Sequence, residues 1–387
     1  MGFLTHASAA VALAFAVRSA RFASSWFEVP LVGARPSEPL PPLSIIVPAR
    51  NEERSIEGCV RSLLRQRYVD AEVIVVDDRS TDATPQILER LARENPRLRV
   101  VRGEPLPEGW VGKPWALDQG ARVALGAWLL FTDADSVHAP AGTASALAFT
   151  LAAKADALSI VTAQQLGSFW EAATLPFILG MIFYASGTLA ELNDPMQPDR
   201  ALANGQYILV SREAYDALGG HAALRGELVE DLRFAKRLKA DGRFRLLVGG
   251  GMRLAQVRMY HSLGEIWAGF TKNLYVGAEG SLASLFLGMT VMSALSAPSI
   301  LAVRAALRRR PYEALEALAA AASIVATSQR GIRMVGMPSV AALLQPLGTA
   351  VFAAIMANST WRVLSGRGVE WRGRRYSGRP ARSEARF

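Results

Sequence analysis

The stretch LSIIVPARNEERSIEGCVRSLLRQRYVDAEVIVVDD, residues 43–78, places an amphipathic segment between two apolar runs. The runs at 43–49 and 71–76 are short and rich in β-branched residues, so they predict buried strands. Between them, apolar side chains such as Ile56 and Val60 recur at helical spacing. A strand, a helix and a second strand in this order predict a parallel pair joined by a crossover helix.

The same alternation continues beyond residue 78. Residues 81–91 and 115–124 predict helices, whereas 98–103 and 129–135 predict strands. The whole pattern predicts an α/β fold with a mostly parallel sheet and helices on both faces, and such sheets bind ligands beyond the carboxyl ends of their strands. The polar residues that fall at these predicted ends are Arg50, Asn51, Glu52, Asp77, Asp78, Asp133 and Asp135.

Asp133 and Asp135 follow the apolar run that begins at residue 129 and are separated by one residue. Two carboxylates that converge at a strand end repel each other, and oxygen ligands of this kind suit a hard divalent cation such as Mg2+ or Mn2+. An Asp-rich turn that caps the next element explains the same stretch equally well. The choice between them depends on the rest of the chain.

The composition indicates a membrane-associated protein. The 387 residues are 51% hydrophobic and carry a formal net charge of +9. Basic clusters such as Arg308 to Arg310 flank apolar segments rather than alternate with aromatic residues, which favours anionic lipid over nucleic acid as the partner. The single cysteine, Cys59, excludes an intramolecular disulfide and lies in a predicted helix, where buried packing is expected.

Several apolar segments predict membrane contact. Residues 281–303 and 337–357 are each long enough to cross a bilayer, whereas 313–327 is marginal and is predicted to lie in the interface, giving two crossings. Three crossings remain an alternative. The predicted organisation is an N-terminal anchor at 1–22, a Pro-rich linker at 32–42, a catalytic domain at 43–280 with an interfacial helix at 170–191, membrane helices at 281–360 and a basic tail at 361–387.

Six stretches of the chain occur in an order that resembles the family 2 glycosyltransferases, which have the GT-A fold. The stretches cover roughly residues 43–280, and a shared order makes them more specific together than any one alone. They are IIVPARNEE (45–53), VIVVDDRSTDAT (73–84), GWVGKPWAL (109–117), LLFTDAD (129–135), ANGQYILVSREAYDALGG (203–220) and VEDLRFAKRLKADG (229–242).

The resemblance implies a role for each matching residue. Asp133 and Asp135, a D-x-D pair, would hold the divalent cation, with Asp135 as the stronger ligand, and Asp133 would also contact the nucleotide sugar. Asp231 would be the catalytic base, with Glu230 in support. The residues implied to bind the nucleotide sugar are Pro48, Arg50, Asn51, Glu52, Asp77, Asp78 and Lys113. An ordinary surface role explains Lys113 equally well.

A membrane-attached bacterial subgroup, which contains hopene-associated and carotenoid glycosyltransferases, is similar in GWVGKPWAL, in NDP at 193–195 and in WRGRRY at 371–376. The chain lacks the Q-x-x-R-W motif of processive members, which implies addition of a single sugar. The implied reaction is inverting, metal-dependent transfer from a nucleotide diphosphate sugar, expected to be a UDP-sugar, to a lipid hydroxyl at the cytoplasmic face of the inner membrane. The acceptor is left open among carotenoid, hopanoid, polyprenyl and glycerolipid.

Two other functions compete with transfer. A sugar nucleotidyltransferase would need a Gly-rich basic loop after the first strand, which PARNEE lacks. A non-catalytic scaffold or lipid-transport subunit would not need intact carboxylates at 133, 135 and 231. Among the histidines, His138 and His221 are predicted to be loop residues. His261 is predicted to be a satisfied surface or interface residue, with a third metal ligand as the alternative.

Overall fold

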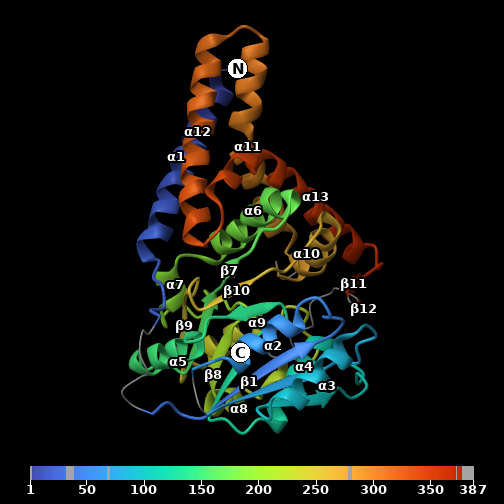
Figure 1. Ribbon diagram of the computed structural model, residues 1–387. Helices are drawn as coiled ribbons and strands as arrows, with labels where there is room; N and C mark the ends of the chain where they lie inside the picture. Colours follow the sequence, from blue (N-terminus) through green and yellow to red (C-terminus); the bar gives the residue numbers. More distant parts are fainter. Residues whose placement is uncertain (1, 32–38, 68–69, 278–280, 372, 377–387) are drawn as a thin grey trace. The chain divides into compact units, whose positions relative to one another are not determined.

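Seven strands form the central sheet, in the order β3-β2-β1-β4-β8-β6-β9 (Figure 1). Strand β8 runs antiparallel to both β4 and β6, and the other neighbouring strands pair in parallel. The predicted α/β class with a mostly parallel sheet is confirmed. The strands are β1 Leu43–Ala49, β2 Ala71–Asp77, β3 Leu98–Arg102, β4 Trp128–Phe131, β6 Ala157–Val161, β8 Ile208–Ser211 and β9 Leu246–Gly250.

This computed structural model describes residues 2–31, 39–67, 70–277, 281–371 and 373–376, and the chain divides into two units. The sheet unit contains Phe27–Gln165 and Leu189–Met259, and the helical unit contains Met1–Trp26, Leu166–Thr188 and Tyr260–Pro380. The sheet unit therefore differs from the predicted range 43–280, because the chain leaves it twice to join the helical unit. The predicted linker falls mostly, and the basic tail partly, outside the described residues.

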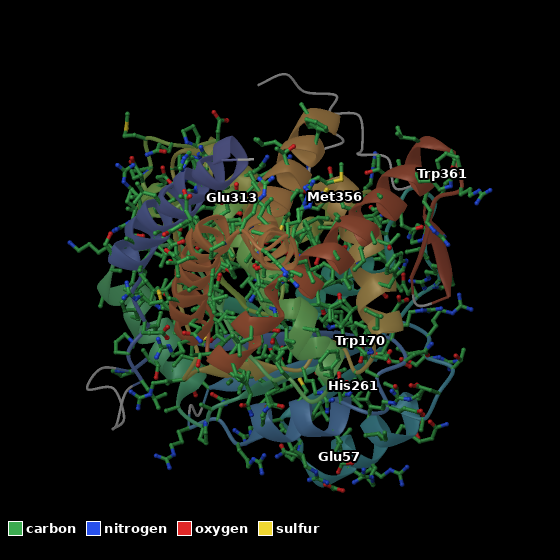
Figure 2. The ribbon with its side chains drawn as sticks, turned by 90° about the horizontal axis from the view of Figure 1, so that it is seen from above. Glu57, Trp170, His261, Glu313, Met356 and Trp361 are labelled. Carbon is green, nitrogen blue, oxygen red and sulfur yellow. The ribbon has the colours of Figure 1, made fainter. Side chains whose placement is uncertain are left out.

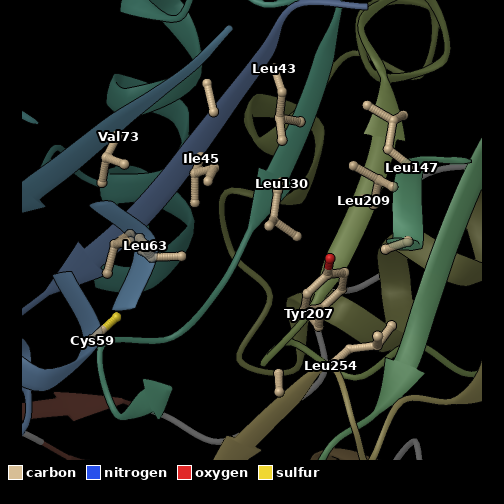
Figure 3. Close-up of a cluster of buried hydrophobic side chains, with 14 of the residues drawn as sticks. Leu43, Ile45, Cys59, Leu63, Val73, Leu130, Leu147, Tyr207, Leu209 and Leu254 are labelled. Atoms are coloured by element: carbon tan, nitrogen blue, oxygen red, sulfur yellow. The ribbon is translucent and has the colours of Figure 1, made fainter. Parts of the chain in front are cut away.

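Helices cover both faces of the sheet because successive side chains of a strand point to opposite sides. Ile45 of β1 packs with Cys59 and Leu63 in one buried cluster (Figure 3). Ile46 points the other way, where a Cβ on Gly120 would lie 2.5 Å from Ile46 Cγ2. The helices of the unit are α2 Ile56–Leu64, α3 Thr84–Glu94, α4 Gly112–Val123, α5 Gly142–Ala152, α7 Leu189–Asn193, α8 Arg212–Ala217, η1 His221–Leu224 and α9 Glu230–Asp241.

A second, three-stranded sheet of the sheet unit continues the chain after β4. It consists of β5 Ser136–His138, β10 Ala255–Val257 and β7 Ala163–Gln164, with β10 in the middle. Strand β10 pairs antiparallel with β5 and parallel with β7. The loop between β4 and β5 therefore has a strand at each end.

The helical unit contains α1 Gly2–Ser25 beside α11 Leu282–Leu307 and α12 Pro311–Met334 (Figure 1). Their contact includes Ala12, Leu295 and Ile324, which are buried together. The marginal segment 313–327 thus lies inside a 24-residue helix. The other elements of the unit are α6 Phe169–Ser186, α10 Leu263–Gly277, η2 Ser339–Leu344, α13 Gln345–Leu364, β11 Val369–Trp371 and β12 Arg374–Tyr376.

Two segments of the described chain, Phe286–Leu307 and Ser339–Leu364, are long and apolar enough to cross a membrane. They overlap both predicted spans. The predicted interfacial helix at 170–191 corresponds to α6 and packs against α13, where a Cβ on Gly348 would collide with Ala173 O and with the ring of Phe177. The number of membrane crossings stays a prediction.

Candidate active site

The loops that follow β1 and β2 are bonded to each other at the carboxyl edge of the sheet. The two strands pair with Ala49 opposite Asp77, so their ends lie side by side. Asn51 N–H donates to Ser80 Oγ at 2.9 Å, and Asn51 Oδ1 accepts from Thr81 N–H at 2.8 Å. The predicted ligand Asn51 therefore already uses its amide oxygen to join the two loops.

Arg50 joins the same two loops. Its guanidinium donates to Asp78 O at 2.6 Å, and Asp78 N–H donates to Ala49 O at 2.7 Å. Asp77 and Asp78 are both buried. A Cβ on Gly103 would lie 2.8 Å from Asp77 O, so a glycine at this position lets the end of β3 approach β2 closely. The predicted pocket residues that share these strand ends are Pro48, Arg50, Asn51, Glu52, Asp77 and Asp78.

Asp133 and Asp135 lie in the loop after β4. The strand ends at Phe131, earlier than the predicted residue 135. Asp135 is partly buried, and its Oδ1, which is shielded from solvent, has no hydrogen-bond partner among the described residues. Burial, together with the charges of Asp133 and Glu52, raises the pKa of Asp135 to about 8. A buried carboxylate without a partner is costly, and a cation would relieve that cost.

No group of three or more His, Cys, Asp or Glu side chains within the described residues forms a ready-made metal site. Mg2+ and Mn2+ commonly take one or two protein carboxylates and fill the remaining positions with phosphate oxygens and water. The unpartnered Oδ1 of Asp135 fits such a site. Asp133 fits it less well, because its Oδ1 already contacts a protein cation, Lys113, at 2.8 Å.

Lys113 lies in the first turn of α4, which begins at Gly112, rather than in a turn before the helix. Its Nζ lies 2.8 Å from Asp133 Oδ1 and 2.8 Å from Glu230 Oε1. Although burial opposes its charge, the nearby carboxylates Asp133 and Glu230 raise the pKa of Lys113 well above its ordinary value. Lys113 is therefore a fixed positive charge between the β4 loop and helix α9, not an ordinary surface lysine.

Asp231 is held at the start of α9 by two backbone donors. Its Oδ2 accepts from Gly205 N–H at 2.9 Å, and its Oδ1 accepts from Leu232 N–H at 2.8 Å. Burial and the charge of Glu230 raise the pKa of Asp231 to about 6, whereas Lys113 opposes this shift. Asp231 is therefore mostly ionised at neutral pH and can accept a proton.

Gly205 completes the contact between the predicted residues, although the sequence did not single it out. A Cβ at this position would lie 2.9 Å from Lys113 Nζ and 3.0 Å from Asp231 Oδ2. Only a residue without a side chain lets the backbone approach both charged groups. Its position inside the matching stretch ANGQY was the available signal.

The structure corrects the prediction for two histidines. His138 lies in strand β5 and His221 begins η1, so neither is a loop residue, and both are buried. His221 Nδ1 lies 2.9 Å from Tyr215 Oη, and its ring stacks on Phe234. Burial lowers the pKa of His221 to about 4, so the ring is neutral at physiological pH.

Comparisons with known proteins agree with these features. Residues 44–218 match the family model described as Glycosyl transferase family 2. The proteins named 4,4'-diaponeurosporenoate glycosyltransferase in Staphylococcus aureus strains USA300 and MRSA252 are each 28% identical to this chain over 340 residues, covering 87% of this chain and 88% of each relative.

Two solved structures are also similar to the chain. A mannosyltransferase from Pyrobaculum calidifontis in complex with GDP-Man and Mn2+ has 22% identity and a TM-score of 0.49, covering 85% of this chain and 96% of that chain. A fragment of TarS from S. aureus has 18% identity and a TM-score of 0.40, covering 85% of this chain and 93% of that chain.

Proposed function

We propose that this chain, whose residues 44–218 match the glycosyl transferase family 2 model, is a glycosyltransferase. We propose that it transfers one sugar from a nucleotide diphosphate sugar to a lipid hydroxyl. We further propose that the reaction inverts the configuration at the anomeric carbon of the sugar, that it requires Mg2+ or Mn2+, and that the donor is a UDP-sugar. The observation that carries this proposal is the ion-pair bridge from Asp133 through Lys113 to Glu230, next to Asp231. It joins the two groups of carboxylates that such a reaction needs.

The donor is bound along the carboxyl edge of the sheet. In this proposal, Asp77 and Asp78 accept hydrogen bonds from the uracil and ribose, while the bonded loops at Arg50 and Asn51 keep the pocket in shape. Asp135, assisted by Asp133, holds the cation, which neutralises charge that develops on the departing diphosphate. Lys113 supplies a second positive charge to the same phosphates.

Asp231 takes the proton of the acceptor hydroxyl as the hydroxyl oxygen bonds to the anomeric carbon. The bond from that carbon to the phosphate oxygen breaks, and its electron pair leaves on the nucleoside diphosphate. Glu230 is a weaker candidate for the base, because its carboxylate is buried against Lys113. We assign Glu230 the role of holding Lys113 in place.

A lipid acceptor is supported by the exposed apolar side chains of the helical unit. Phe286 and Leu307 of α11 are 69% and 81% exposed, and Trp170 and Trp361, both labelled in Figure 2, are 37% and 60% exposed. Surfaces of this kind suit a bilayer, with tryptophan at its interface. We propose a carotenoid-type acceptor in the inner membrane, by analogy with the name of the S. aureus relatives, with the sheet unit in the cytoplasm.

The acid limb of the pH profile of kcat/KM should reflect the ionisation of Asp231. We expect kcat/KM to fall as the pH drops through about 6, because protonated Asp231 cannot accept a proton. Lys113→Met should move this limb to higher pH, since Lys113 favours the charged form of Asp231. Lys113→Arg, which keeps the charge, is the matched control. An identical limb in the Met variant would contradict the coupling of these two residues.

The protein should remain bound to membranes when high salt screens its ionic contacts with lipid headgroups. We expect the full-length chain to remain in the membrane fraction after a wash with about 1 M NaCl, because salt at this strength screens charges but leaves apolar burial intact. Detergent should release it. Release by salt alone would show that basic residues, rather than the apolar helices, hold the protein at the membrane.

The proposed function can be tested with the intact protein in detergent. We expect radiolabelled sugar to pass from a UDP-sugar to extracted membrane lipid in the presence of Mn2+, and mass spectrometry should show one added hexose-type unit on the lipid. EDTA should stop the reaction. Products with several added sugars, or transfer that continues in EDTA, would overturn the single-sugar or the metal-dependent part respectively.

A further inference from the structure

His138 lies at the far end of the loop that contains Asp133 and Asp135. The loop begins at Thr132, whose N–H donates to Ile46 O at 3.1 Å and so extends the ladder between β4 and β1. It ends in β5, where His138 pairs with Ala255 of β10. His138 is only 4% exposed.

The side chains of Thr132 and His138 close this loop across its base. Thr132 Oγ1 donates to Gln206 O at 2.8 Å, and His138 Nε2 lies 3.0 Å from the same Thr132 Oγ1. A threonine hydroxyl has one hydrogen, which is committed to the carbonyl of Gln206. His138 must therefore donate from Nε2 to Thr132, which fixes the neutral tautomer with its proton on Nε2.

The other nitrogen agrees with this tautomer. His138 Nδ1 is buried and has no hydrogen-bond partner among the described residues. An Nδ1 that carried a hydrogen would be a buried donor without an acceptor, which is costly. The ring therefore supplies one directed hydrogen bond, from Nε2.

Helix α2 holds the same loop from a second side. Ser62 Oγ accepts from His138 N–H at 3.0 Å and donates to Cys59 O at 2.7 Å, while Cys59 Sγ lies 3.6 Å from Asp133 O. Ser136 N–H donates to Asp133 O at 3.2 Å. The backbone of the loop is thus attached at both ends, and the bond from His138 to Thr132 sets the distance between those ends.

We propose that His138 is a positioning residue for Asp133 and Asp135: its Nε2–H bond to Thr132 holds the loop in the shape that presents both carboxylates to the cation and the diphosphate. This inference rests on the proposed function, because it presumes that these carboxylates bind a metal–diphosphate group. His138 itself contacts neither the substrate nor the reacting atoms.

Two substitutions separate the nitrogens of His138. In His138→Gln, the side-chain amide nitrogen can occupy the position of Nε2 and donate to Thr132. In His138→Asn, the shorter side chain reaches only the position of Nδ1, so this bond is lost. We expect the affinity for UDP in the presence of Mn2+ to fall about 10-fold to 100-fold in the Asn variant and to be largely restored in the Gln variant.

Calorimetry on the full-length protein measures this, with UDP plus Mn2+ as one probe and uridine as the other. Uridine lacks phosphate, so its affinity should be the same in the wild type and both variants. If the Asn variant does not fold, Thr132→Val removes the same hydrogen bond, together with the bond from Thr132 to Gln206 O, while keeping the shape of the side chain. It should show the same selective loss.

The outcomes separate this inference from the proposed function. A wild-type protein whose UDP affinity is independent of Mn2+ would overturn the metal assignment itself. A Mn2+-dependent wild type with an equally Mn2+-dependent Asn variant would overturn only the role of His138. An equal loss of uridine and UDP affinity, or no recovery in the Gln variant, would show that His138 serves the general stability of the fold.

Discussion

Asp231→Asn should reduce sugar transfer by a factor of about 100 to 10,000, the usual contribution of a positioned general base. The asparagine keeps the size of the side chain, and its amide oxygen can still accept from Gly205 N–H or from Leu232 N–H. It cannot take the proton of the acceptor. Steady-state kinetics and calorimetry with a UDP-sugar should therefore show a large loss in kcat and a nearly unchanged affinity for the donor.

Glu230→Gln is the matched control because it alters the neighbouring residue on the same helix. It weakens one of the two ion pairs of Lys113 but leaves Asp231 in place. We expect a smaller loss of transfer, on the order of tenfold, and an acid limb that moves to lower pH, because the charge of Glu230 raises the pKa of Asp231. If Glu230→Gln abolished transfer while Asp231→Asn did not, Glu230 would be the base.

The same experiment distinguishes a hydroxyl from a carboxylate as the acceptor. A carboxylate is already ionised at neutral pH and needs no base, so Asp231→Asn would then cost little. The charges of Glu230 and Asp231 would also repel an anionic acceptor, which is why we favour a hydroxyl.

Asp135→Ala should lower the affinity for UDP in the presence of Mn2+ by a factor of about 100 or more, because the Mn2+-dependent part of binding is lost. The variant removes the buried carboxylate whose Oδ1 has no partner among the described residues. Calorimetry with UDP, in the presence of Mn2+ and then of EDTA, measures the difference. Uridine, which lacks phosphate, should bind the variant as well as it binds the wild type. An Asp135→Ala variant with unchanged UDP affinity in Mn2+ would contradict the metal assignment.

Thermal unfolding of a second variant at this position, Asp135→Asn, gives an independent measurement. The folded pKa of Asp135, about 8, lies above its ordinary value of 3.8, so the folded protein binds a proton that the unfolded chain releases. This group therefore stabilises the fold least above pH 8, and its unfavourable effect develops as the pH rises from about 4 to about 8. In EDTA at pH 8, Asp135→Asn should melt at a higher temperature than the wild type. Mn2+ should stabilise the wild type only.

Local sequence patterns were sufficient for the first four strands of the central sheet. The apolar runs at 43–49 and 71–77 became neighbouring parallel strands because only a buried strand removes such short, β-branched runs from water. The polar residues that follow them had to lie at one edge, since parallel strands end on the same side. For this reason Asp77, Asp78 and Asp133 could be predicted to lie at the same edge of the sheet.

Contacts between distant segments could not be predicted from local sequence patterns. Lys113 was equally consistent with a surface residue, because its ion pairs with Asp133 and Glu230 depend on how α4 and α9 pack around the sheet. His138 looked like a loop residue, because its burial comes from β10 and α2. Local patterns record the spacing of side chains along one element, whereas these partners come from other elements.

The division of the chain into two units also depends on contacts between distant segments. The sequence order suggested one continuous domain from 43 to 280, but segments Leu166–Thr188 and Tyr260–Pro380 pack with the N-terminal helix in a separate unit. The hydrophobicity of a segment indicates that its apolar side chains must be buried away from water, but it does not indicate which other segment packs against them. The sequence alone thus determined which carboxylates lie at the strand ends. The tertiary structure decided their charge states and placed Lys113 beside them, because both depend on burial and on packing between elements far apart in the chain.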